Sequence, residues 1–91
     1  MQHRAWRSGR ETVSYQEEEL RCNFTCTYAN PGQPQMLYLG DRCTVSGIER
    51  KLSTEELARI EERLRKFLTE KRVFGIRVGT QEVRIIREQS L

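Results

Sequence analysis

The chain has 91 residues, of which 36% are hydrophobic and 32% are charged, and Lys and Arg exceed Asp and Glu by 16 to 13. That length supports one modest hydrophobic core and excludes two, and a core of this size is marginal without a partner chain. Because no long apolar run or secretory leader occurs, we expect no membrane segment and a soluble cytoplasmic protein.

The positive charge is concentrated at the start of the chain, where three arginines precede the first acidic residue: Arg4, Arg7 and Arg10. The rest of the chain holds 13 basic groups (16 less 3) and 13 acidic groups, so the body of the domain is neutral. Residues 1–11 show neither helix nor strand periodicity, and we expect a flexible basic arm in which Trp6 docks on the domain. Residues 12–91 are expected to form a single α+β domain.

Two segments of alternating polarity follow the arm and predict β-strands. The first covers residues 12–16, with Val13 and Tyr15 on one face. Residues 17–19 are three adjacent glutamates, which predict a solvated turn. The second segment, residues 20–28, has the clearest alternation in the chain, and we expect it at the centre of the sheet. Its apolar face is expected to hold Leu20, Cys22, Phe24, Cys26 and Tyr28.

Turn residues then separate two further strands. Pro31 and Gly32 suit the central positions of a type II turn and close the preceding strand. Residues 36–39 predict a strand that is apolar on both faces, and residues 42–46 predict another. Between them, Gly40 and Asp41 favour a turn or a sharp bend, with a single bulged strand as the alternative.

Residues 52–71 predict the one helix, and the rest of the fold depends on it. Ser53 and Glu56 have the spacing of a capping box and mark its N-terminus. Five apolar residues recur at helical spacing and form one stripe: Leu57, Ile60, Leu64, Phe67 and Leu68. A stripe of this kind must pack against another surface, so we expect the helix to lie on one face of a sheet.

Two strands are expected after the helix, over residues 73–78 and 82–87. In the first of them the apolar residues alternate and are expected to face one way: Phe74, Ile76 and Val78. The predicted order β-β-β-β-α-β-β corresponds to an α+β fold, an antiparallel β-sheet with one amphipathic α-helix packed on one face.

The sequence predicts no catalytic, cofactor or metal site. His3 is the single histidine, and it lies in the expected arm, away from any nucleophile on a rigid scaffold. Cys22, Cys26 and Cys43 lack the spacing of a zinc site, and we expect buried free thiols. The carboxylates gather at residues 17–19 and on the helix surface, where they are expected to be solvated. We therefore expect a protein without enzymatic activity, cofactor or small-molecule substrate.

Nucleic-acid binding is the alternative function that the sequence offers. It is supported by six arginines of the arm and the last two strands: Arg4, Arg7, Arg10, Arg77, Arg84 and Arg87. A sheet that binds single-stranded RNA, however, exposes aromatic rings for base stacking, and the polar face of residues 20–28 presents none. The arginines are also explained as solvated charges at sheet edges. We therefore place this function second.

The favoured interpretation is a protein-binding module that acts as a homodimer. Residues 36–39, together with Ile85 and Ile86, are apolar on both sides, although one helix covers one face of the sheet. An apolar surface that a monomer cannot bury marks an interface, and a symmetric homodimer is expected before another protein. The expected contact residues are Leu37, Tyr38, Leu39, Ile86 and Trp6.

Overall fold

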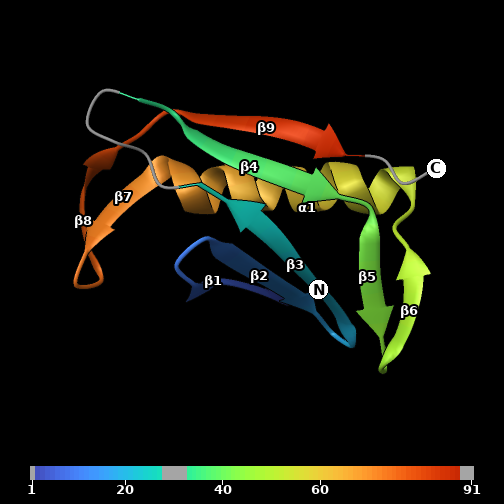
Figure 1. The fold of residues 1–91 in the computed structure, drawn as a ribbon. Coiled ribbons are helices and arrows are strands. Elements are labelled where there is room, and N and C mark those ends of the chain that lie inside the picture. Colours follow the sequence, from blue (N-terminus) through green and yellow to red (C-terminus); the bar gives the residue numbers. More distant parts are fainter. Residues whose placement is uncertain (1, 28–32, 89–91) are drawn as a thin grey trace.

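The computed structural model describes residues 2–27 and 33–88 (Figure 1). Within these ranges the chain forms nine strands and one helix. The elements are β1 His3–Gly9, β2 Thr12–Glu17, β3 Leu20–Cys26, β4 Gln35–Gly40, β5 Arg42–Val45, β6 Ile48–Lys51, α1 Thr54–Thr69, β7 Glu70–Val73, β8 Ile76–Thr80 and β9 Val83–Glu88. The expected α+β class is confirmed. None of the described helical structure is long and apolar enough to cross a lipid bilayer.

Seven strands form one sheet in the order β1-β2-β3-β4-β9, with β5 paired to β3 and β6 paired to β5. Strand β3 lies at its centre, as predicted. The sheet is mixed, because β9 runs parallel to β4, so the prediction of a purely antiparallel sheet was wrong for this pair. Parallel neighbours require a long crossover connection, and here that connection contains α1. Strands β7 and β8 form a separate two-stranded sheet.

The first segment of the chain is a strand, so the expectation of a flexible arm was wrong for His3–Gly9. Strand β1 pairs antiparallel with β2, with Ala5 opposite Tyr15 and Trp6 opposite Ser14. Its alternation is hard to recognise because the positions that face the helix hold His3, Ala5 and Arg7, of which none is a large aliphatic residue.

Helix α1 begins with the predicted capping box. The Glu56 amide donates to the Ser53 hydroxyl, and the Ser53 amide donates to the Glu56 carboxylate. The helix ends at Thr69, two residues before the expected end, because Glu70 has an extended backbone. Four residues of the predicted stripe are buried: Leu57, Ile60, Leu64 and Leu68. Burial of each of these four side chains stabilises the fold by about 1.5–3 kcal/mol. The fifth residue of the stripe, Phe67, is partly exposed.

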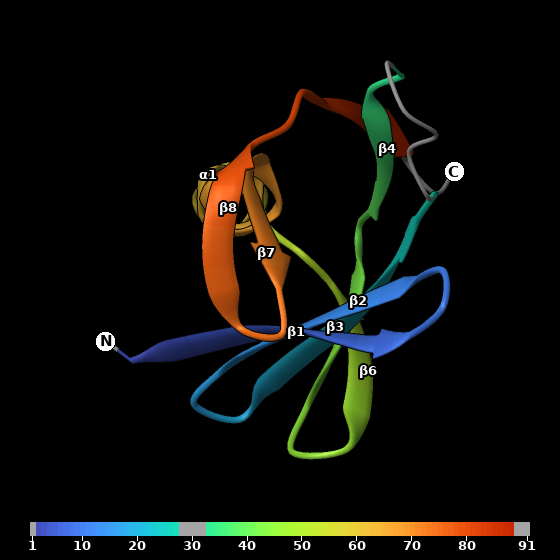
Figure 2. The ribbon, with the colours of Figure 1, turned by 90° about the vertical axis from the view of Figure 1, so that its left-hand side faces the viewer.

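The sheet curls around the helix, and the core lies between them (Figure 2). On β3 the predicted apolar face is buried from Leu20 to Cys26, whereas Tyr28, Pro31 and Gly32 lie outside the described residues.

At Gly40 and Asp41 the chain bends sharply between β4 and β5. Both of these strands pair antiparallel with β3, so the chain direction is not reversed. The expected sharp bend is therefore confirmed, and a tight hairpin turn at this point is excluded.

Candidate partner-binding surfaces

Hairpin β7–β8 lies at one end of the molecule, opposite hairpin β5–β6 (Figure 1). Phe74 and Gly75 connect its strands, and their φ angles of 52° and 79° are both positive, as a type I′ turn requires. The predicted strand over residues 73–78 is therefore interrupted by this turn. Phe74, Ile76 and Val78, which we call the hairpin patch, are 99%, 68% and 56% exposed.

The sequence predicts one continuous strand here and not an exposed patch, because apolar alternation shows that residues share a face but not whether that face is covered. The available signal was Gly75, since a glycine within an apolar run favours a turn. In the described chain, β7 and β8 pair with each other alone. A two-stranded ribbon is marginally stable in water, and adjacent large apolar side chains at its surface are typical of a contact site.

The expected contact residues on β4 divide between the two faces of the sheet. Leu37 and Leu39 are 0% and 1% exposed because they pack in the core beneath the helix, so their assignment to a partner surface was wrong. Tyr38 lies on the opposite face beside Ile86, its partner in the β4–β9 register. Ile86 is 39% exposed, so Tyr38 and Ile86 form a small apolar site there.

Trp6 lies on this same outer face of the sheet, because it stands opposite Ser14, which in turn stands opposite Asn23. The Arg4 guanidinium lies over its ring, 4.5 Å from the ring centroid. The outer face of the sheet therefore presents aromatic rings from β1 and β4, whereas the polar face of the described part of β3 carries none, as predicted. Trp6 and Tyr38 are nevertheless three strands apart, roughly 14 Å across the sheet, so the structure does not bring them together.

The six arginines of the nucleic-acid alternative are scattered over the molecule. Arg4 lies on the outer face of β1, Arg7 on its groove-lining face, Arg10 in the β1–β2 turn, Arg77 on β8, and Arg84 and Arg87 on opposite faces of β9. Arg84 is ion-paired with Glu82 at 3.3 Å, and Arg87 with Glu61 at 3.1 Å. The structure therefore does not assemble them into one phosphate-binding surface.

Glu17 is buried, and the expectation that it lies in a solvated turn was wrong. Its Oε2 accepts hydrogen bonds from the Tyr15 hydroxyl at 2.6 Å, Arg59 Nε at 3.1 Å and Arg63 Nη1 at 2.9 Å. Burial raises the pKa of this carboxyl, but the hydrogen bonds from Arg59 and Tyr15 and the two guanidinium charges outweigh burial, so the net pKa is lowered. This ionised carboxylate joins the sheet to the helix. Its hydrogen bonds to Tyr15, Arg59 and Arg63 account for its burial.

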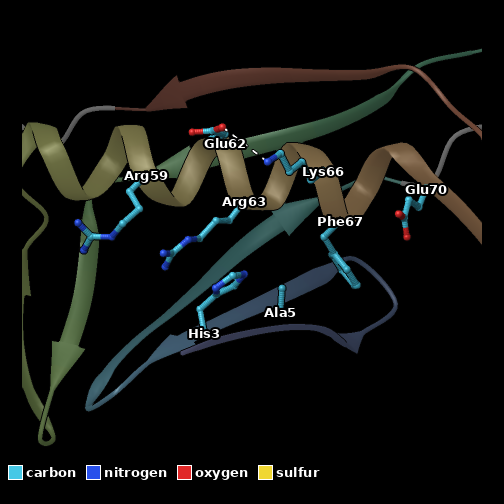
Figure 3. Close-up of a pocket in the computed structure, with 8 residues that line it drawn as sticks. All are labelled: His3, Ala5, Arg59, Glu62, Arg63, Lys66, Phe67 and Glu70. Atoms are coloured by element: carbon cyan, nitrogen blue, oxygen red, sulfur yellow. Dashed lines mark ion pairs between the residues drawn. The ribbon is translucent and has the colours of Figure 1, made fainter. Parts of the chain in front are cut away.

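A groove separates β1 from α1 and the start of β7. It consists of two adjoining cavities of about 510 and 570 Å³ that share Ala5, Phe67 and Glu70. Figure 3 shows His3 and Ala5 pointing from β1 toward the helix, and Phe67 pointing from the helix toward β1. Sequence reasoning did not find this groove, because its walls come from segments about 60 residues apart, and pairing between such segments has no local signal.

Cys22, Cys26 and Cys43 are buried and free, as predicted. Burial raises the pKa of all three thiols, that of Cys22 to about 12. In residues 2–27 and 33–88, no three His, Cys, Asp or Glu side chains are grouped so that they could hold a metal ion. Comparisons with protein families, curated proteins and solved structures found no match.

Proposed function

We propose that this protein is a non-enzymatic protein-binding module that acts as a homodimer through the hairpin patch. The observation that carries the proposal is the exposure of Phe74, Ile76 and Val78 on a two-stranded sheet that has no further strand beside it in the described chain. An apolar surface of this kind is more typical of an interface than of a solvated hairpin.

A second copy of the chain fits the geometry of β8. One edge of β8 pairs with β7, and within residues 2–27 and 33–88 no strand pairs with its other edge. If two β8 strands pair antiparallel about a two-fold axis at Val78, each Val78 meets its counterpart and Arg77 stands opposite the partner's Gly79. This register places no two like charges directly opposite each other, an arrangement that would destabilise the strand pair. The two ribbons become one four-stranded sheet with a self-complementary interface.

Apolar contacts across this strand pair favour association. Pairing of the two β8 strands places the apolar side chains of one copy beside those of the other on one face of the joined sheet, and each cross-strand apolar pair contributes about 0.2–1 kcal/mol. Tyr38 and Ile86 remain available on the outer face for a different partner.

The test compares two Glu substitutions by light scattering. Val78→Glu places two carboxylates together at the proposed axis, so we expect the mass of one chain, 10.8 kDa. Ile48→Glu is the matched control, because Ile48 is 73% exposed but lies on hairpin β5–β6 at the other end of the molecule. We expect this variant to keep the dimer mass. A Val78→Glu protein that stays dimeric would contradict the proposal, as would an Ile48→Glu protein that becomes monomeric.

Single-stranded nucleic acid is the second candidate ligand, and one observation favours it. Trp6, Arg21 and Arg42 line a hollow of about 410 Å³ on the outer face of the sheet. A ring beside guanidinium groups suits base stacking with phosphate contacts. Binding of a fluorescent oligo-dT that falls steeply with salt and is lost in Arg21→Glu would establish this candidate. Absence of binding at low salt would eliminate it.

A further inference from the structure

Two strand edges border the groove beside α1. Strand β1 is the last strand of its sheet, and β7 pairs on one side only, with β8, in the described chain. Residues of both strands line the same cavity of about 570 Å³: Ala5, Trp6 and Arg7 of β1, and Glu70, Lys71 and Arg72 of β7. Alternate residues of an edge strand direct their N–H and C=O groups outward, so the cavity offers main-chain partners for one more strand.

The side chains of the groove are apolar at its centre and cationic around it. Ala5 and Phe67 line both cavities, and Figure 3 shows them in the first cavity. The cationic side chains are Arg7, Arg59, Arg63, Lys66, Lys71 and Arg72. Two carboxylates line the groove, and a third, the buried Glu17, is ion-paired with Arg59 and Arg63. With Arg7 set aside, five cationic side chains face these three carboxylates, which leaves an excess of two positive charges.

We propose that this groove binds an extended acidic peptide, which adds as a β-strand along the edge of β1 and places an apolar side chain against Phe67. In strand addition, main-chain hydrogen bonds supply affinity and alternate side chains supply specificity. The five residues from His3 to Arg7 offer an edge of roughly 17 Å, so a peptide of six residues is long enough. The proposal rests on the protein-binding function but uses a surface separate from the hairpin patch.

The first experiment measures fluorescence anisotropy with three labelled hexapeptides at low salt. The probes are Glu-Val-Glu-Leu-Glu-Val, its lysine counterpart Lys-Val-Lys-Leu-Lys-Val, and Glu-Val-Glu-Pro-Glu-Val, in which proline disrupts strand pairing. We expect the first peptide to bind at least about tenfold more tightly than either of the others. Equal affinity for all three, or no binding of the first at about 1 mM, would overturn the proposal.

Matched substitutions locate the binding. Lys71→Glu reverses a charge in the groove, and Arg65→Glu makes the same change at an exposed helix position that lies outside it. Lys71→Glu should weaken binding by about tenfold, whereas Arg65→Glu should have little effect; equal weakening would indicate unspecific attraction and refute the site. Ala5→Phe, which fills the groove, should abolish binding, with its melting temperature as the control for folding.

The two proposals fail separately. A Val78→Glu monomer that still binds the acidic peptide would support the groove site while isolating it from dimerisation. A dimeric protein that does not discriminate among the three peptides would overturn the groove site and leave the homodimer proposal intact.

Discussion

Replacing Glu17 with glutamine removes the charge that holds Arg59 and Arg63 of the helix against strand β2. Hydrogen bonds between charged groups contribute about 1.5–3 kcal/mol each. Glutamine keeps part of this network, and the Arg59 and Arg63 side chains, 33% and 23% exposed, can recover water. We therefore expect a net loss of about 2–3 kcal/mol. For a chain of this length, that loss lowers Tm by about 10–20 °C.

The assay is urea denaturation at neutral pH, followed by circular dichroism. Glu18→Gln is the control, because Glu18 is the adjacent residue but its side chain is exposed. We expect the control to remain within about 0.5 kcal/mol of the unmodified protein, with the same urea dependence in all three proteins. A Glu17→Gln protein as stable as Glu18→Gln would show that the buried network does not stabilise the fold.

Two further predictions concern titration and thiol chemistry. The pKa of Glu17 is lowered, and the hydrogen bond from Arg50 lowers the pKa of Glu56 to about 2. A folded pKa below the unfolded value of 4.5 makes the stabilisation complete above about pH 4.5 and lost as the pH falls further. Urea midpoints should therefore decrease below about pH 4.5, and Glu56→Gln should reduce that decrease. A urea midpoint that does not change over this pH range would contradict the prediction. Cys22, Cys26 and Cys43 are buried, and burial raises the pKa of each thiol. All three should therefore react with a thiol reagent on unfolding only, and rapid labelling of the folded protein would refute this.

The sequence predicted the elements whose evidence is local. Helix α1 and strand β3 were identified because an apolar stripe of period 3.6 and an alternation of period 2 are both complete within one segment. Strand β1 was missed because Ala5 and its polar neighbours occupy the positions that face the helix. The hairpin patch was misinterpreted because alternation shows which residues share a face, but not whether another surface covers that face.

Contacts between distant segments explain the remaining errors. Glu17 has two neighbouring glutamates, so its local sequence predicts solvation, yet its partners Arg59 and Arg63 lie 42 and 46 residues away. Leu37 and Leu39 belong to a strand that is apolar on both faces, and the sequence of that strand does not indicate which face the helix covers. The groove also depends on long-range structure, because β1 and β7 come to line one cavity only in the folded chain.

Disulfide cross-linking tests the central claim, that hairpin β7–β8 joins two copies, most directly. In an antiparallel pair centred on Val78, the two Cα atoms are about 4.5–5.5 Å apart, which is within the range for a disulfide. Val78→Cys should therefore form a covalent dimer under mild oxidation by glutathione disulfide, whereas Ile48→Cys on the opposite hairpin should remain a single chain. Failure of Val78→Cys to cross-link, or equal cross-linking of both variants, would contradict the account.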